Sequence, residues 1–422
     1  MPKKEYGWAN GNIPIIGDHS LAKHRILREY VQKYVEILTS DPRIDRFKLA
    51  LVDGFAGGGI YQRVGHAEPH LGSPAILMEA MASAEAAVAK TRQKQIRIEA
   101  NYYFVDKNEE NIAALEKTLQ DHVYPRYPGA TPSILTGRFE EKLPAIVADI
   151  KKKGKSHRAI FLLDQYGYTA VPLSTLQRIF NELPKAEVFL TLAVGWIAGY
   201  LRSVKNAPDV IRRSLGIRES ASEEEIEEKL LGGAGTNEKL RVVQKLLHDA
   251  FVGDSGARFA TPFFIVSRES HRPYWFLHLA NSTRANEVVK ELHWAMQNHF
   301  SHYGDAGLAM LGFDPDREAD PAQLSFAFDS FAMQKTEKAL LEEIPRRIAT
   351  AHRDGVSFDA LFAAVTNETP ATKDMLGAVV ATLCRVGDLG KQGGAGERRH
   401  LETALHDDDV IFPSGQGKLP WQ

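Results

Sequence analysis

The chain has little cysteine, no long apolar run and almost no net charge. Its single cysteine, Cys384, excludes a disulfide within the chain and a metal cluster held by several of its cysteines. The apolar run at residues 188–198 is too short for a membrane-spanning helix, which needs about 20 residues, and is expected to form a buried strand. The N-terminus starts with polar residues instead of an apolar signal core, so we expect a cytoplasmic protein with no membrane association.

The absence of net charge excludes a global electrostatic attraction to nucleic acid or membrane. The 52 lysines and arginines nearly balance the 54 aspartates and glutamates, which leaves a formal net charge of −2. The length of 422 residues is enough for two or three domains with a large core. Any binding function must therefore depend on local sites.

Predicted strands and helices alternate over the first half of the chain. Such alternation is typical of an α/β fold, and it predicts a Rossmann-like, doubly wound parallel sheet. The predicted strands are 49–53, 102–106, 133–136, 159–163 and 187–194, and the predicted helices are 20–38, 74–90, 108–120, 140–152 and 173–183.

The pattern changes after Trp196. Residues 197–252 have only helical patterns, which include a capping box of Ser222 and Glu225, and we interpret them as a helical insertion. Two closely spaced strands follow at 259–266 and 274–280, and then a helix at about 284–301. An antiparallel hairpin at the sheet edge is how sheets of S-adenosylmethionine (SAM) methyltransferases usually finish, so residues 1–313 are predicted to form one SAM-methyltransferase-like domain.

The C-terminal part has the order of a winged helix-turn-helix domain. After a linker at 314–332, residues 333–422 contain predicted helices at 334–350, 357–365 and 371–384, followed by a glycine-rich hairpin at 387–412. Residues 331–422 carry eleven lysines and arginines against thirteen aspartates and glutamates, so their net charge is −2. DNA affinity grows with the number of phosphates neutralised, so we expect weak, salt-sensitive nucleic-acid binding at most, and favour a protein contact.

The strongest chemical signal is the run LALVDGFAGGG at residues 49–59. A short apolar strand ends at Asp53 and continues into Gly57, Gly58 and Gly59, which allow a sharp turn and a close ligand approach. A second apolar strand ends at Asp106, where an acid is placed to hold ribose hydroxyls. In open α/β sheets, ligands bind at the carboxyl ends of the strands.

Three kinds of cofactor are compatible with a glycine-rich turn in general. A phosphate-binding P-loop needs lysine and serine or threonine after the glycines, and Ile60 stands there instead. A dinucleotide needs a helix directly after the turn, yet the next helix is predicted to begin with Ser73 as N-cap and Pro74 at its first position. SAM has no phosphates, so its binding does not need a helix N-terminus directly after the glycine turn. We therefore favour SAM over a dinucleotide or a purely structural turn.

A second constellation, FLLDQYGY at residues 161–168, ends the strand 159–163. Amino-directed methyltransferases carry an acid or amide, two prolines and an aromatic residue at this point. Asp164 fits the acid, and Tyr166 or Tyr168 could stack on a base, a contact worth about 1–3 kcal/mol. The prolines are missing, because Gln165 and Tyr166 stand there. The alternative is a strand-end Asp164 that caps the next loop, with tyrosines that pack on helix 173–183.

Histidines are frequent between residues 271 and 302. His299 and His302 have the i, i+3 spacing of two metal ligands, with Asp305 nearby, but no third histidine shares their helix face. We expect structural histidines and no metal site.

Several long motifs together resemble one known family, the three-Cys-motif partner (TcmP) proteins. They are the helix with Lys23, His24, Tyr30 and Tyr34, the DGFAGGG loop, the Gly72 helix start, FLLDQYGY, and the run HLANSTRANEVVKELHW with HYGDAGLAMLGFDPD. The resemblance covers essentially the whole chain. It implies a SAM-methyltransferase-like domain followed by a winged helix, and a partner protein that resembles radical-SAM enzymes. By motif, it implies a cofactor loop of Asp53, Gly54, Phe55, Gly57, Gly58 and Gly59, a ribose contact at Asp106, and an acceptor side at Asp164 and Tyr166.

Two hypotheses of different class follow. In the first, the chain is a SAM-dependent methyltransferase that acts on nucleic acid or a nucleotide together with its three-Cys-motif partner. In the second, it is a non-catalytic recognition or regulatory partner that keeps the fold, which the missing prolines and the long loop at 60–71 favour.

Overall fold

The computed structural model describes residues 7–8, 11–129, 131–154, 156–165, 170–193, 247–266, 273–296, 330–393 and 405–414. The described chain divides into two compact units, one up to Leu292 and the other from His293 onward. Several predictions fall outside the described residues: most of the insertion (197–246) with its capping box, the linker at 314–329, Tyr166, Tyr168, His299, His302 and Asp305. The part of the insertion that is described, residues 247–252, is helical.

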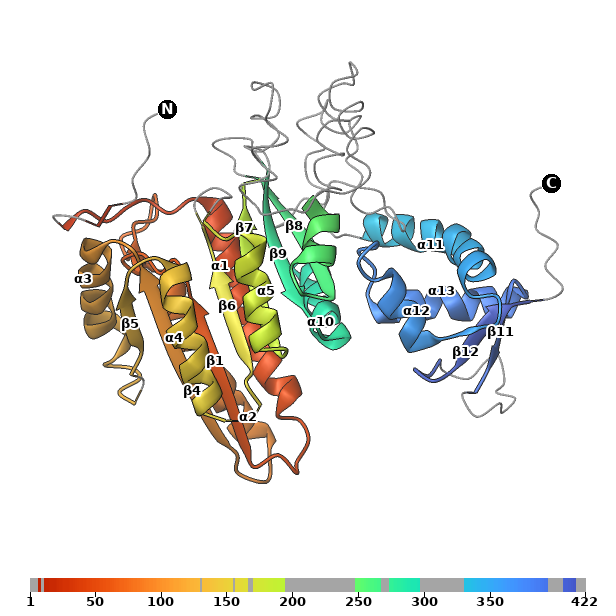
Figure 1. The fold of residues 1–422 in the computed structure, drawn as a ribbon, viewed down its shortest axis with the longest axis horizontal. Helices are drawn as coiled ribbons and strands as arrows, with labels where there is room; N and C mark the ends of the chain where they lie inside the picture. Colours follow the sequence, from red (N-terminus) through yellow and green to blue (C-terminus); the bar gives the residue numbers. More distant parts are fainter. Residues whose placement is uncertain are drawn as a thin grey trace, which may run out of the picture. The chain divides into compact units, whose positions relative to one another are not determined.

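The first unit contains a seven-stranded, mostly parallel sheet in the order β5-β4-β1-β6-β7-β9-β8 (Figure 1). Five strands are parallel, and β9 is antiparallel to both of its neighbours. The mixed α/β architecture and the antiparallel hairpin at the sheet edge are therefore as predicted. The strands are β1 (Arg46–Asp53), β4 (Arg97–Asp106), β5 (Ser133–Thr136), β6 (Ala159–Leu163), β7 (Ala186–Leu192), β8 (Phe259–Val266) and β9 (Pro273–Ala280).

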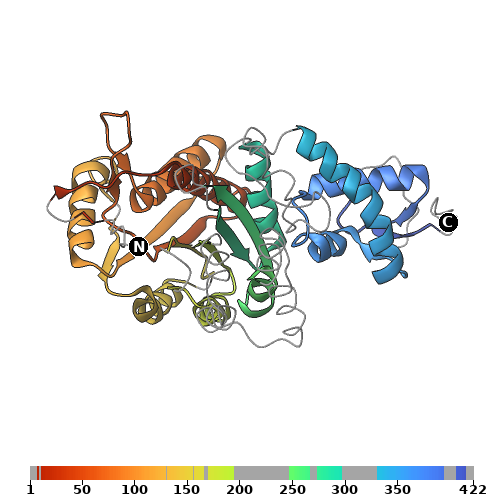
Figure 2. The same ribbon diagram turned by 90° about the horizontal axis from the view of Figure 1, so that it is seen from above.

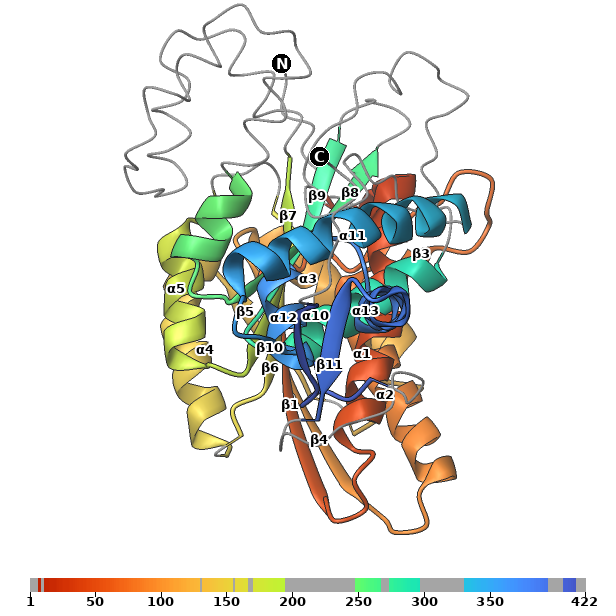
Figure 3. The same cartoon turned by 90° about the vertical axis from the view of Figure 1, so that its right-hand side faces the viewer.

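Helices cover both faces of this sheet. Two views agree that α1 (Asp18–Leu38) and α2 (Ser73–Thr91) lie on one face, and α4 (Phe139–Lys152) and α5 (Leu173–Glu182) on the other (Figures 2 and 3). Strands β6 and β7 are buried along their whole length, because they are sandwiched between the two helix layers. Other described helices of this unit include α3 (Glu109–Thr118), which continues as the π-helix Leu119–Val123, and α10 (Thr283–Ala295).

The structure differs from the sequence-based prediction at several element ends. The loop at 60–71 contains a short hairpin of β2 (Ile60–Tyr61) and β3 (His70–Leu71), too short to leave a periodic pattern. Gly72, not Ser73, is the N-cap of α2. Strand β4 begins five residues earlier than expected, because ion pairs of Arg46 and Arg97 with Glu99 cover its polar start. Helix α10 ends at Ala295 instead of about 301.

In its described residues, the second unit contains three helices and a small antiparallel sheet in the order β10-β12-β11. Its core contains fully buried side chains such as Leu340, Leu361 and Val380. Gly387 ends α13 in the left-handed conformation, with φ of 86°, a role that suits glycine. The elements are α11 (Ser330–Ala351), β10 (Val356–Ser357), α12 (Phe358–Val365), α13 (Lys373–Val386), β11 (Leu389–Gln392) and β12 (Val410–Pro413). Strand β10 was not predicted.

In the described part of the chain, no helix is both long enough and apolar enough to cross a membrane.

A buried polar cluster connects α1 to the sheet. The Tyr30 hydroxyl donates a hydrogen bond to Glu187 Oε2 at the start of β7, and His278 Nε2 on β9 lies 3.0 Å from the same oxygen. Burial raises the pKa of Tyr30 well above its usual value, and the Glu187 carboxylate adds to this effect. The hydroxyl therefore stays protonated and acts as a donor to Glu187.

We predict different stability effects for two neighbouring tyrosines of α1. Tyr30→Phe removes a donor from a buried carboxylate and should lower the free energy of unfolding by about 1–3 kcal/mol. Tyr34→Phe is the matched control, because the Tyr34 hydroxyl has no hydrogen bond within the described residues, and its effect should stay below about 0.5 kcal/mol. Urea denaturation measures both, and equal effects would contradict the role assigned to Tyr30.

Candidate functional site

Three aspartates lie at the carboxyl ends of adjacent parallel strands. Asp53 ends β1, Asp106 ends β4, and Asp164 directly follows β6. Strand β1 lies between the other two, and the strand order reverses between β1 and β6, since the chain reaches β4 and β5 on one side before it returns to β6 on the other. Asp53 and Asp164 therefore flank the point at which open α/β sheets bind ligands.

Asp53 is fully buried and incompletely bonded. Its Oδ1 accepts a hydrogen bond from the Phe55 backbone N–H at 3.0 Å, whereas Oδ2 has no hydrogen-bond partner among the described residues. Burial raises the pKa of Asp53 to about 7; the nearby Ser73 hydroxyl and the Phe55 N–H oppose the increase, and the nearby carboxylates of Asp164 and Asp106 add to it. The carboxyl group is thus poised to change charge near neutral pH.

The glycine turn is fixed between the neighbouring strands and covered by a tryptophan. Gly57 and Gly59 have positive φ values of 58° and 71°, which favour glycine. A Cβ on Gly57 would lie 2.8 Å from Cη2 of Trp8, and one on Gly58 would overlap the same indole ring. Trp8 Nε1 donates to the Ile60 carbonyl at 2.6 Å, so the indole is held over the turn. The close approach that these glycines permit is made here by Trp8.

The other predicted loop residues have structural surroundings of their own. The Gly54 N–H donates to the Leu162 carbonyl at 2.9 Å, and a Cβ on Gly54 would collide with Leu163 and Phe139. Phe55 is half-buried near Phe139, with ring centroids 6.3 Å apart. Gly54 therefore fixes the turn between strands.

Asp106 supports the glycine turn instead of standing free. Its Oδ2 accepts the Gly57 backbone N–H at 3.0 Å, and its Oδ1 accepts from Asn108 N–H at 2.8 Å and from Asn111 Nδ2 at 3.1 Å. A carboxylate offers about four acceptor sites, so these three donors leave about one for a ligand.

Asp164 forms a close ion pair that was not predicted from the sequence. Lys23 Nζ on α1 lies 2.6 Å and 2.5 Å from its two carboxylate oxygens, and the Lys23 side chain is only 7% exposed. Burial alone would raise the pKa of Asp164, but the Lys23 ammonium outweighs it and holds this pKa below its usual value. Asp164 is thus ionised, and the Lys23 ammonium balances its charge.

Gln165 organises the loop after Asp164. It stands where a proline was expected, and its Oε1 accepts the backbone N–H groups of Ala170 at 2.9 Å and Val171 at 3.1 Å. Its Nε2 is buried without a hydrogen-bond partner among the described residues. The amide therefore connects the two ends of the loop that carries Tyr166 and Tyr168.

A histidine pair lies beside Lys23. His24 Nδ1 is 3.0 Å from Nε2 of His70 on β3, and the two rings stack. Burial lowers the pKa of His24 to about 3, and the nearby charges of His70 and Lys23 lower it further. The sequence analysis did not predict Lys23 or His24 as site residues. The signal that could have identified them is a lysine and a histidine on the apolar stripe of helix 20–38.

This edge suits a cation better than an anion. It combines a buried carboxyl group with an open oxygen, a second carboxylate with about one open acceptor site, and a third that is already paired. Within the described residues no group of three histidine, cysteine, aspartate or glutamate side chains could hold a metal ion.

Comparison of the chain with known protein-family models and with curated proteins finds no match. The resemblance to the three-Cys-motif partner proteins therefore stays a prediction.

We predict a pH-dependent stability effect for Asp53→Asn. The folded-state pKa of about 7 exceeds the unfolded value of 3.8, so the contribution of Asp53 to stability is full below pH 3.8 and is lost as pH rises through 7. Relative to the wild type, Asp53→Asn should therefore gain on the order of 4 kcal/mol between pH 4 and pH 8. Asp121→Asn, at an exposed position, is the control and should show no such trend in urea denaturation.

Proposed function

We propose that the carboxyl edge of the large sheet binds SAM and that the chain is a SAM-dependent methyltransferase acting on nucleic acid or a nucleotide. The strand order supports this, because an antiparallel β9 inserted between β7 and the edge strand β8 is how sheets of SAM methyltransferases usually finish. The acids at the ends of β1 and β4, around a glycine turn, support the same proposal.

The open oxygen of Asp53 is the observation that carries the proposal. A buried carboxyl oxygen without a partner among the described residues is costly unless a ligand donates to it. The amino-acid end of SAM carries an ammonium group that suits it. Asp106 would take a ribose hydroxyl at its remaining acceptor site, and Gly57 would stay bonded to the same carboxylate.

Asp164 would face the methyl acceptor. SAM, when bound, supplies a methyl group on a positively charged sulfur. The chain's own contribution is to hold the acceptor: Asp164 would accept a hydrogen bond from an amine, Lys23 would keep Asp164 ionised, and Tyr166 or Tyr168 would stack on the base. Because Lys23 contacts both Asp164 oxygens, the acceptor must share this carboxylate with the ammonium.

The proposal extends to the second unit as a winged-helix domain. The order α11-β10-α12-α13-β11-β12 supports it. Lys373 at the start of α13 contacts Asp359 and Asp407, both at 2.8 Å, so this cation is already neutralised and offers little to a phosphate backbone. We therefore propose that this domain contacts a protein, the three-Cys-motif partner, and binds nucleic acid only weakly.

A non-catalytic partner is the second candidate function. Trp8 covers the glycine turn, and Asp106 is largely occupied by protein donors, so groups of the chain already fill much of the space a cofactor would take. SAM binding separates the two candidates.

We predict that the wild-type chain binds SAM or S-adenosylhomocysteine in isothermal titration calorimetry. Asp53→Asn should lose a hydrogen bond to a charged group, worth about 1.5–3 kcal/mol, which is a ten- to hundredfold loss of affinity. Asp121→Asn should bind like the wild type. Absence of binding at millimolar ligand would reject the methyltransferase in favour of the non-catalytic partner.

We predict that Asp164→Asn destabilises the fold through Lys23. The substitution leaves a buried ammonium without its partner, and breaking such a pair costs about 3–5 kcal/mol, less here because Asp164 is 27% exposed. Adding Lys23→Met should restore most of this stability, but not methyl transfer from labelled SAM to nucleic acid. Recovery of transfer in the double variant would show that Asp164 is structural only.

A further inference from the structure

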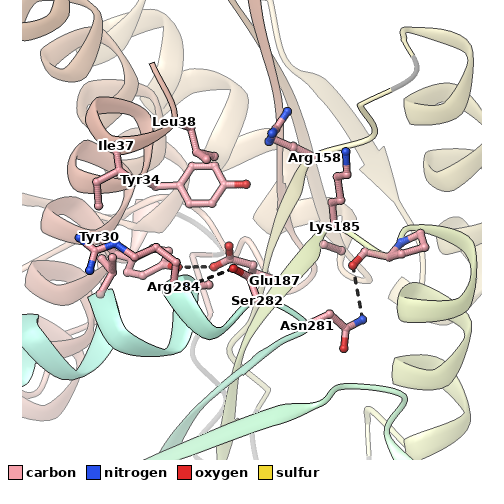
Figure 4. Close-up of a pocket in the computed structure, with 14 residues that line it drawn as sticks. Tyr30, Tyr34, Ile37, Leu38, Arg158, Lys185, Glu187, Asn281, Ser282 and Arg284 are labelled. Carbon is pink, nitrogen blue, oxygen red and sulfur yellow. Dashed lines mark hydrogen bonds between the residues drawn. The ribbon is translucent and has the colours of Figure 1, made fainter. Parts of the chain in front are cut away.

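A pocket lies at the edge of the same sheet opposite the three aspartates, where the parallel strands begin. Its volume is about 300 Å³, at the lower end of the range for small-molecule sites. It is formed by the end of α1, the residues just before β6 and β7, and the start of α10 (Figure 4). All lining residues are described and belong to the first unit. The glycine turn and the three aspartates contribute nothing to it.

Two cations that line this pocket have no hydrogen-bond or ion-pair partner among the described residues. The register pairs Ala159 with Ala186, so Arg158 and Lys185, which precede them, lie side by side at the strand starts. Neither side chain has a hydrogen bond or ion pair within the described residues; Arg158 only stacks over the ring of Phe47 at 6.0 Å. Two adjacent unpaired cations repel each other, and an anion between them would relieve this repulsion.

Arg284, the third cation that lines the pocket, differs from Arg158 and Lys185 because it forms ion pairs. Arg284 contacts Glu287 at 2.8 Å and Glu291 at 2.9 Å and is therefore neutralised by its own helix. The excess positive charge of the pocket is thus concentrated at Arg158 and Lys185.

The remaining walls limit what kind of anion fits. Ile37, Leu38 and Val288 provide apolar surface, and the Tyr34 hydroxyl reaches the pocket without a partner among the described residues (Figure 4). Glu187 also lines the pocket, with Oε2 bonded to Tyr30. Its negative charge disfavours a dianion such as phosphate, whereas a monoanion still gains from two cations.

We propose that this pocket binds a small carboxylate with an apolar or aromatic body. The carboxylate lies between Arg158 and Lys185 and accepts a hydrogen bond from Tyr34, and the apolar body contacts the side chains of Ile37 and Val288. Guanidinium groups recognise carboxylates through charge-assisted hydrogen bonds. Since no residue is shared with the Asp53 edge, this proposal stands or falls independently of SAM binding.

The test compares matched acids and amides on the full-length protein. Calorimetry is performed with benzoate, indole-3-acetate and octanoate, each against its neutral amide. At least one acid should bind at submillimolar strength and at least tenfold more tightly than its amide. Inorganic phosphate should not displace it. Binding of no acid, equal binding of acid and amide, or displacement by phosphate would overturn the proposal.

Variants locate the site. Arg158→Gln with Lys185→Gln should reduce acid binding at least tenfold and leave amide binding unchanged, and Tyr34→Phe should weaken acid binding severalfold without a loss of stability. Arg178→Gln, on the exposed face of α5 where Arg178 pairs with Glu182 at 2.9 Å, is the matched control and should bind like the wild type. Unchanged acid binding in the double variant, with its melting temperature intact, would place the acid elsewhere and overturn the proposal.

Discussion

The gathering of three carboxyl groups at one sheet edge, Asp53 buried and Asp106 and Asp164 half-buried, is the constraint on which the rest of this structure depends. The charge of each carboxyl group is accommodated in a different way. Asp106 is stabilised by three protein donors and Asp164 by the Lys23 ammonium. Asp53 has a pKa near 7, so it can take up a proton and lose its charge. The chain itself occupies most of the acceptor sites of Asp106 and neutralises Asp164. Only Asp53 keeps an oxygen without a partner among the described residues, so a ligand that donates hydrogen bonds finds an unoccupied acceptor there.

The same constraint determines what the glycines are for. Gly57 is fixed from two sides, because its N–H is bonded to Asp106 and its Cα faces the Trp8 indole. The turn is therefore preorganised without a cofactor, and a ligand that bound here would meet the indole before the backbone. This explains why the sequence pattern alone left a structural turn as an alternative: the residues that shape a cofactor loop and those that pack a tryptophan are the same.

Much of the fold could be predicted from the sequence because long apolar strands and amphipathic helices have distinct periods. Strand β6 and strand β8 have the predicted bounds. Strands β2, β3 and β10 are only two residues long each, which is too short for an alternation of apolar and polar residues to be recognised. The site was predicted in part: the strand-end acids are visible as acids after apolar runs, whereas the contact of Lys23 with Asp164 joins residues 141 positions apart and depends on how α1 crosses the sheet. No periodic pattern along the sequence reveals that crossing.

Helix α1 is the element that connects these features. Its first turns supply Lys23 to Asp164 and His24 to His70 at the carboxyl edge, its middle supplies Tyr30 to Glu187, and its end supplies Tyr34 and Leu38 to the pocket at the amino edge. A helix rises about 1.5 Å per residue, so Lys23 and Leu38 are about 22 Å apart along one rigid element. A polar side chain on the buried stripe of such a helix is costly unless it meets a partner in the sheet. The polar residues of this stripe therefore fix the position of α1, and with it the surroundings of both edges.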